Sequence, residues 1–223
     1  MTRRILVLGG GFAGLWSALA AARAREVFGA DLEIVLLNDT PWHSIRVRNY
    51  EADLSDTRVT LDSVLAPVGV RRLLGRVTGL DVASRTVTYG FDGVQQLIGY
   101  DRLVFALGSR LARPPIPGLA KYGFDVDTYD AAMRLNEHVV RLGSGASTVL
   151  VVGGGLTGIE AAAEMPDKLR AAGVASPRVI LADHAPRIGS NMGAEAAPAT
   201  EEALQALGAA MRAVSSTRPS GRV

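Results

Sequence analysis

The sequence contains the same glycine pattern twice. Residues 5–14 read ILVLGGGFAG and residues 149–158 read VLVVGGGLTG, so each copy is an apolar run that enters Gly-x-Gly-x-x-Gly. An alanine-rich stretch with helical character follows each copy. A β-rich run, a glycine turn and a helix in this order form the context in which the motif binds a dinucleotide. The chain is therefore expected to carry two dinucleotide sites.

Three positions in each copy have separate physical tasks. The first glycine allows a sharp turn from strand to helix, and the second lets a pyrophosphate reach backbone N–H groups that a Cβ would cover. The third lets the helix pack closely on the strand, and the phosphates then lie at the helix N-terminus. A single copy could equally be a plain turn, but two copies with matched flanks favour binding. The glycines are Gly9, Gly11 and Gly14 in the first copy and Gly153, Gly155 and Gly158 in the second.

Composition excludes several classes of function. The 223 residues are 48% hydrophobic, which is enough for one large domain or two modest ones. The net charge is +2 without a run of like charges, so no nucleic-acid partner is expected. The chain has no cysteine, and its histidines form no ligand spacing with acidic residues, so no disulfide, thiol nucleophile or metal site is expected.

The pattern along the first half predicts a Rossmann-like unit with an insertion. Strands are expected at 4–8 and 32–37 around a helix at 13–25. Short β-like pieces from 59 to 99 predict an antiparallel β-meander, and 100–109 predicts another buried strand. Three prolines between 111 and 118 exclude a helix there and indicate a rigid connector.

The second half repeats the α/β pattern. A helix is expected at 127–142, strands at 148–152 and 178–182, and between them a helix from Thr157 with a kink at Pro166. A further helix is expected at 201–214, followed by a polar tail at 215–223. The predicted fold class is α/β, with two Rossmann-like units and an inserted meander. The predicted domains are 1–113 and 114–223, the second of them incomplete.

Polar residues at two strand ends are candidates for binding ribose. A dinucleotide fold uses an acidic side chain there to accept hydrogen bonds from the ribose hydroxyls. In the second unit the strand runs directly into Asp183. The matching position in the first unit is Asn38, but Asp39 could serve with a small shift, so both remain candidates.

Four ordered motifs resemble a known superfamily. They are the first glycine fingerprint, YDRLVFALGS at 100–109, IPG at 116–118 and GGGLTGIE at 153–160. Together they resemble the FAD/NAD(P)-dependent pyridine nucleotide oxidoreductases, and within these most closely the type II NADH dehydrogenases. The resemblance implies FAD in residues 1–113 and a nicotinamide dinucleotide in 114–223. Hydride would pass from nicotinamide to flavin, and electrons from flavin to an acceptor.

The resemblance also implies roles for individual residues. In the family Val77 would pass near the adenine, and Leu107 replaces a usual threonine, so that threonine contact is lost. The implied FAD-binding residues are Gly9, Gly11, Phe12, Ala13, Gly14, Asn38 or Asp39, Val77, Ala106 and Gly108. The implied nicotinamide-binding residues are Gly153, Gly155, Leu156, Thr157, Gly158 and Asp183.

Two acidic residues distinguish the second copy from the first. Glu160 stands where the first copy has Trp16, and the resemblance implies a catalytic position near nicotinamide and flavin. The helix dipole alone also favours an acidic residue there. The Asp183 carboxylate would bond a free 2′-hydroxyl and repel a 2′-phosphate, which favours NADH over NADPH, although His184 and Arg187 could offset this.

The missing cysteines narrow the expected electron acceptor. Relatives that reduce disulfides or peroxide need reactive cysteines, so a quinone, a dye or a protein acceptor is expected instead. The sequence has no signal peptide and no stretch near the roughly 20 apolar residues of a membrane span. The expected location is the cytoplasm, with peripheral attachment at the inner membrane face in a longer form. Family members continue well beyond this length, so an inactive fragment is the alternative expectation, and the oligomeric state is left open.

Overall fold

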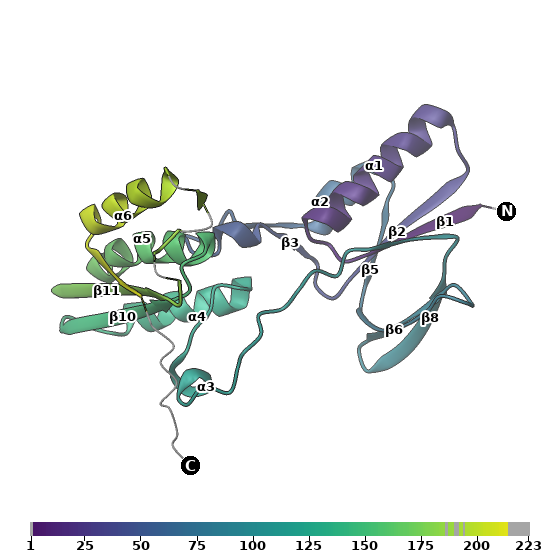
Figure 1. The fold of residues 1–223 in the computed structure, drawn as a ribbon. Coiled ribbons are helices and arrows are strands. Elements are labelled where there is room, and N and C mark those ends of the chain that lie inside the picture. Colours follow the sequence, from purple (N-terminus) through teal and green to yellow (C-terminus); the bar gives the residue numbers. More distant parts are fainter. Residues whose placement is uncertain (1, 186, 190–191, 194, 214–223) are drawn as a thin grey trace, which may run out of the picture. The chain divides into compact units, whose positions relative to one another are not determined.

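A computed structural model describes residues 2–185, 187–189, 192–193 and 195–213. The chain forms two compact units (Figure 1). The first unit comprises Met1–Ile45 and Ser55–Pro114, and the second comprises Arg46–Leu54 and Pro115–Val223. One division therefore falls in the proline-rich connector. The assignment of Arg46–Leu54 to the second unit has no counterpart in the predicted domains.

A parallel sheet forms the centre of the first unit. Its strand order is β5 (Arg71–Leu74), β2 (Leu32–Asn38), β1 (Arg3–Leu8) and β9 (Arg102–Phe105). Helix α1 (Phe12–Phe28) connects β1 to β2. Successive side chains of a strand point to opposite faces, and β1 and β2 are covered on both. That is why both strands are almost continuously apolar.

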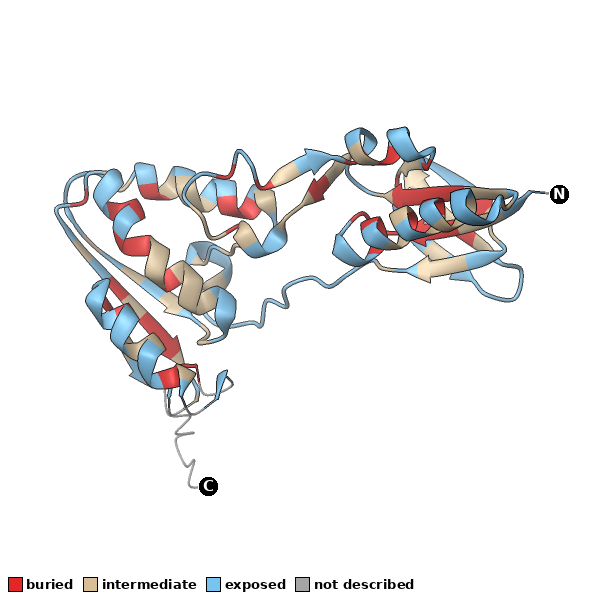
Figure 2. Cartoon of the chain, turned by 90° about the horizontal axis from the view of Figure 1, so that it is seen from above, coloured by how far each residue is buried: buried red, intermediate tan, exposed pale blue. Residues whose placement is uncertain are grey.

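The two faces of this sheet contact different elements. Val7, Ile34 and Leu36 pack with α1, whereas Leu6 and Leu37 on the opposite face pack with the antiparallel strands. The antiparallel sheet has the order β6 (Arg76–Asp81), β7 (Thr86–Phe91) and β8 (Val94–Gly99). Figure 2 shows buried residues concentrated on the central strands. The predicted α/β class with an inserted antiparallel element is confirmed.

The predicted meander at 59–99 was too long at its start. Strand β4 (Arg58–Thr60) pairs with β3 (Trp42–Ser44), and α2 (Leu61–Leu65) and a 3₁₀ turn (Ala66–Val68) follow. Strand β5 then joins the parallel sheet beside β2. Thr60 caps α2 by accepting a hydrogen bond from the backbone N–H of Ser63, a local signal that favours a helix over a strand.

The predicted buried strand at 100–109 is also corrected. Only β9 is extended, and it lies at the edge of the parallel sheet. Its Phe105 side chain is 65% exposed, so the apolar composition of this stretch does not reflect burial on both faces.

The second unit repeats the arrangement with three parallel strands. Their order is β10 (Ala146–Val152), β11 (Ser176–Asp183) and β12 (Ala209–Ala213). The helices are α3 (Leu119–Tyr122), α4 (Tyr129–Val140), α5 (Leu156–Ala171) and α6 (Ala196–Ala206). One core joins α4, α5 and α6 to the sheet through residues that include Val139, Leu169, Leu181 and Leu204.

The helix predicted at 201–214 was wrong in its second half. Helix α6 ends at Ala206, and Gly208 adopts φ +89°, a left-handed conformation that ends helices. Residues 209–213 then pair in parallel with β11. Helix α5 continues through Pro166 to Ala171 without a break. The predicted tail at 215–223 lies outside the described residues.

Candidate dinucleotide sites

The two glycine loops have nearly the same geometry. Gly9 and Gly153 adopt φ +100° and +111°, values that L residues rarely take. A Cβ on Gly14 would lie 1.8 Å from the carbonyl oxygen of Gly9, and a Cβ on Gly158 would lie 1.8 Å from that of Gly153. Each third glycine therefore lets the helix lie against the turn that precedes it, as expected from the pattern.

The second glycine of each loop borders open space. No atom lies within 4 Å of a Cβ built on Gly11 or Gly155. These residues precede α1 and α5, and neither helix has a side-chain cap at its N-terminus. The first backbone N–H groups of a helix lack partners within the helix and carry the positive end of its dipole. Each loop thus fits a pyrophosphate that a side chain at this position would displace.

A polar side chain at the strand end braces each loop. In the first unit the N–H of Gly10 donates to Asn38 Oδ1 at 2.8 Å. In the second unit the N–H of Gly154 donates to Asp183 Oδ2. Asn38 and Asp183 are therefore equivalent in structure and differ in charge, because one is an amide and the other a carboxylate.

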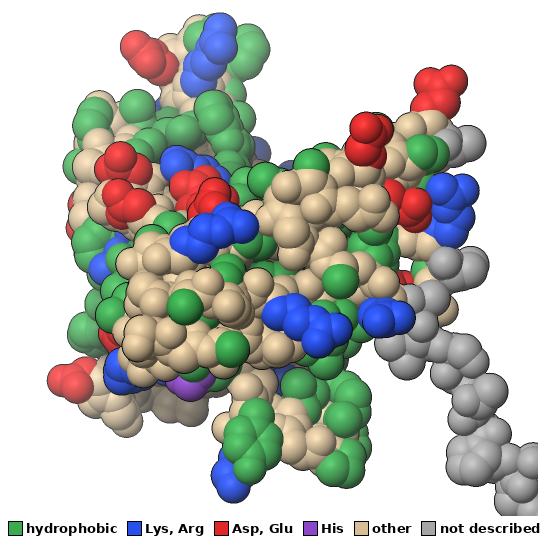
Figure 3. Space-filling view, turned by 90° about the vertical axis from the view of Figure 1, so that its left-hand side faces the viewer, with side chains coloured by type: hydrophobic (Ala, Val, Ile, Leu, Met, Phe, Trp, Pro, Cys, Tyr) green, Lys and Arg blue, Asp and Glu red, His purple; other side chains and the backbone are tan. Residues whose placement is uncertain are grey.

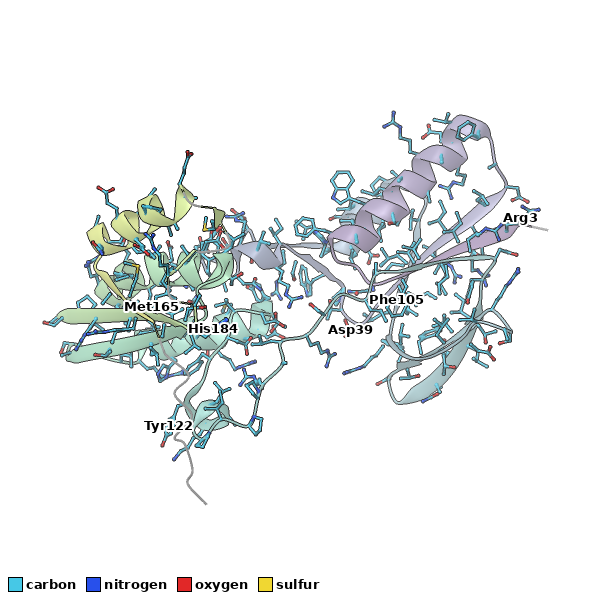
Figure 4. All side chains as sticks on the ribbon, viewed as in Figure 1. Arg3, Asp39, Phe105, Tyr122, Met165 and His184 are labelled. Carbon is cyan, nitrogen blue, oxygen red and sulfur yellow. The ribbon has the colours of Figure 1, made fainter. Side chains whose placement is uncertain are left out.

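The Asn38 amide is largely used within its own loop. Its Nδ2 donates to the carbonyl oxygen of Thr40 at 2.9 Å and lies 3.2 Å from Thr40 Oγ1. Its neighbour Asp39 is exposed, and the structure gives this carboxylate no hydrogen bond or ion pair. Figure 4 labels Asp39 where the chain leaves β2. Of the two candidates, Asp39 thus has more free hydrogen-bonding capacity.

A cavity of about 420 Å³ lies at the carboxyl end of the parallel strands in the first unit. It contains the predicted residues Gly9, Asn38, Asp39, Val77 and Gly108. The predicted residues Gly11, Phe12, Ala13, Gly14 and Ala106 do not line it. The lining also includes residues that were not predicted as ligands, namely Leu37, Gly75, Arg76, Leu107, Ser109 and Arg110. The guanidinium groups of Arg76 and Arg110 make the cavity suitable for an anionic ligand.

Asp183 has a well-satisfied carboxylate. Its Oδ1 accepts a hydrogen bond from the N–H of Ala185 at 2.7 Å and lies 3.2 Å from His184 Nδ1. The backbone N–H groups of Ala185 and Gly154 hold the pKa of Asp183 below its ordinary value of 3.8. A carboxylate whose pKa is lower in the folded chain stabilises the fold. For Asp183 this stabilisation is fully present above the pKa that Asp183 has in the unfolded chain, and it is lost as the pH falls through its pKa in the folded chain.

His43, in strand β3, is buried against the first glycine loop. Its side chain is 6% exposed, and its Nδ1 lies 2.8 Å from the carbonyl oxygen of Gly10. A carbonyl oxygen only accepts, so Nδ1 carries the hydrogen. The Phe12 ring packs edge-on against the imidazole at 5.1 Å. His43 therefore supports the first glycine loop through its contacts with Gly10 and Phe12.

Trp16 and Glu160 occupy equivalent positions in the two copies of the glycine pattern. Trp16 is 65% exposed on α1. Glu160 is half-buried on α5, one turn after Leu156 and Thr157 at the start of that helix. Tyr50, from the segment 46–54, lies within the electrostatic influence of Glu160 and Glu164. No local sequence signal points to Tyr50, because Tyr50 and Glu160 are 110 positions apart.

The described part of the chain contains neither a membrane-spanning helix nor a cluster of metal ligands. None of its helices combines the length and apolar character needed to cross a bilayer. Nor do three or more of its acidic or histidine side chains gather where they could hold a metal ion. Acidic and basic side chains are interspersed on the face seen in Figure 3.

The fold and the two loops define a class of proteins with tandem dinucleotide-binding units. The family model for pyridine nucleotide-disulphide oxidoreductases matches residues 3–218, and the chain belongs to this family. It is an oxidoreductase family, and its type II NADH dehydrogenases use FAD and NADH.

Known relatives agree with this family and are longer than the chain. NADH dehydrogenase-like protein Rv1812c of Mycobacterium tuberculosis is 48% identical over 90% of this chain and 52% of its own length. Type II NADH:quinone oxidoreductase NdhA of the same organism is 27% identical over 85% of this chain and 45% of its own length. The structure of NDH2 from Plasmodium falciparum with NADH shares the fold, with a TM-score of 0.75 at 16% identity over 96% of this chain and 48% of that chain. The chain thus spans about half the length of these proteins.

Proposed function

We propose that the chain provides the FAD-binding and NADH-binding loops of an NADH:acceptor flavoprotein oxidoreductase with a quinone-type acceptor. The observation that carries this proposal is the pair of matched loops, one braced by a neutral amide and one by a carboxylate. Bound flavin would supply the redox chemistry by accepting hydride from NADH and passing electrons on. The quinone is inferred from the absence of cysteine in the sequence and from relatives named as quinone oxidoreductases, such as NdhA. A quinone acceptor would place the working enzyme at a membrane surface.

The residues have distinct tasks in this proposal. The open edges at Gly11 and Gly155 admit the pyrophosphates to the starts of α1 and α5. Asn38 and His43 hold the first loop in shape through the two polar groups of Gly10. The ribose of NADH would bond Asp183, and Glu160 would lie beside the nicotinamide as the candidate catalytic residue.

The direct test is the colour and reduction of the purified 223-residue chain. The proposal predicts a yellow protein, either as isolated or after FAD is added, whose visible absorption bleaches when NADH is supplied without oxygen. A chain that stays colourless after incubation with FAD would contradict it. Flavin that binds but is not reduced by NADH would contradict the second loop's role alone. Decylubiquinone added after bleaching should restore the yellow colour.

Asp39, rather than Asn38, is proposed as the ribose anchor of the first unit. The Asp39→Ala variant should bind FAD roughly 10- to 100-fold more weakly, because an ionised hydrogen-bond partner contributes roughly 1.5–3 kcal/mol. Flavin fluorescence titration measures this affinity. The stability of Asp39→Ala should match the parent, since the structure gives this carboxylate no bond to lose. Asn38→Ala is the matched comparison, because it removes the brace on Gly10 and should destabilise the first unit. Parent-like FAD affinity in Asp39→Ala would exclude this role.

The charge of Asp183 is proposed to set the preference for NADH. Asp183→Asn keeps an oxygen acceptor for Gly154 N–H and reproduces the arrangement that Asn38 already provides in the first unit. Losing the repulsion toward a 2′-phosphate should reduce the ratio of NADH to NADPH affinity by about tenfold. Titration of both nucleotides gives the ratio, and Asp183→Ser is a second variant without the charge. An unchanged ratio in both variants would refute the assignment.

A further inference from the structure

The segment 46–54 interrupts the sequence of the first unit but is fastened to the second. Asn49 is 1% exposed, and its Nδ2 donates to the carbonyl oxygen of Val126 at 3.2 Å. On α4, Asn136 Nδ2 donates to the carbonyl oxygen of Ala52 at 3.0 Å and lies 3.4 Å from that of Glu51. The second unit thus binds the backbone of a segment that the domain prediction placed elsewhere.

A buried lysine completes this attachment. Lys168 on α5 is 7% exposed, and its Nζ donates to Asn136 Oδ1 at 2.9 Å. The same amide therefore accepts from Lys168 on one side and donates to the segment on the other. Burial lowers the pKa of Lys168 to about 8, while Glu164 and Glu51 favour its charged form. A lysine is rarely this buried without partners, and the attachment supplies them.

The spacing along α5 connects this attachment to the nicotinamide loop. Glu160, Glu164 and Lys168 are four residues apart, so they follow one face of the helix toward its N-terminus. That terminus carries the Gly155 loop. Burial and the negative charges of Glu160, Glu51 and Glu164 raise the pKa of Tyr50 above 10.0, and Arg48 opposes them. Tyr50 itself lies between Asn49 and Glu51, whose contacts with Val126 and Asn136 hold this part of the segment on the second unit.

We propose that Lys168 and Asn136 form a clamp that holds residues 46–54 on the second unit and so positions Tyr50 beside Glu160 as a further residue of the nicotinamide half-site. The role of Tyr50 in binding NADH rests on the proposed function, whereas the clamp itself does not. In this proposal Tyr50 would supply an O–H donor to that half-site. The charged groups that act on Tyr50 are Glu160 and Glu164 from α5 and Arg48 and Glu51 from its own segment.

The clamp can be tested without any ligand through the titration of Tyr50. The difference in tyrosinate absorbance between the parent and Tyr50→Phe isolates this phenol from the other four tyrosines. In Lys168→Met and in Asn136→Ala, the released segment should let the pKa of Tyr50 fall toward about 10, its ordinary value. Removing a positive charge without releasing the segment would raise that pKa instead. The direction of the shift in Lys168→Met therefore separates a clamp from simple electrostatics.

Hydrogen exchange and a matched variant complete the test of the clamp. Amides in residues 46–54 should exchange faster in Lys168→Met and Asn136→Ala than in the parent. Arg170→Met removes an exposed cation from the same helix and should change neither measurement. Unchanged hydrogen exchange in residues 46–54 would overturn the clamp. So would a raised pKa of Tyr50 in Lys168→Met together with an unchanged pKa of Tyr50 in Asn136→Ala.

The role of Tyr50 is tested with NADH itself. Tyr50→Phe should weaken NADH binding about three- to tenfold, and NADH should shift the tyrosinate titration of the parent. Equal NADH affinity in Tyr50→Phe would overturn this role while leaving the proposed function intact. A parent chain that does not bind NADH would overturn the proposed function and the role of Tyr50, and the titration without ligand would still decide the clamp.

Discussion

Gly155→Val is expected to abolish most NADH binding while leaving the fold intact. Gly155 has φ −76° and ψ 176°, which valine adopts without strain, and its Cβ would enter empty space. The side chain would, however, occupy the place proposed for the pyrophosphate. Losing one or two hydrogen bonds to a charged group corresponds to roughly 10- to 100-fold weaker binding. NADH fluorescence titration measures the effect.

The first loop offers the matched variant. Gly11→Val makes the same change at φ −73° and ψ −172°, again next to empty space. It should weaken FAD binding by a similar factor and leave NADH binding unchanged. If Gly155→Val weakens both ligands equally, the assignment of one dinucleotide to each loop is wrong. If neither variant affects any ligand, the loops are not the binding sites.

Gly14→Ala is expected to destabilise the first unit strongly. The new Cβ would lie 1.8 Å from the carbonyl oxygen of Gly9, so α1 must move away from the turn. We expect a loss of about 3 kcal/mol, the upper range for overpacking. Both tryptophans, Trp16 and Trp42, belong to the first unit, so their fluorescence during urea unfolding reports this unit separately.

Gly158→Ala provides the control for this measurement. It creates the same 1.8 Å contact with the carbonyl oxygen of Gly153, but in the second unit, which contains no tryptophan. The tryptophan transition should therefore stay at the parent's urea concentration, while the far-ultraviolet circular dichroism transition moves. A Gly14→Ala variant with a parent-like tryptophan transition would show that α1 accommodates the methyl group.

Sequence predicted the parts of the fold that depend on local conformation. Left-handed backbone at Gly9 and Gly153 and the close approach at Gly14 and Gly158 follow from having glycine in that order between a strand and a helix. The equivalence of Asn38 and Asp183 was accessible because the two copies could be compared with each other. These features need only a few neighbouring residues to be specified.

The errors involve contacts between distant residues. Leu204, Leu207 and Met211 have helical spacing, yet Met211 lies in a strand because residues 209–213 pair with β11. Similarly, β5 joins β2 across more than 30 residues, and no local pattern distinguishes it from a meander strand. The clamp on residues 46–54 depends on Asn136 and Lys168, far along the sequence, so neither periodicity nor a motif indicates it. Tertiary pairing decided each of these cases over local propensity.

The path of the chain through residues 46–54 has a consequence for protein engineering. The backbone passes from one unit to the other at Ile45, at Leu54 and at Pro114, not only in the proline-rich connector. In a chimera joined at Pro114 whose first part comes from a relative, residues 46–54 would therefore be the relative's, whereas Asn136 and Lys168 would be native. Exchange of the second unit between relatives requires residues 46–54 to be transferred with it, through two additional junctions at Ile45 and Leu54.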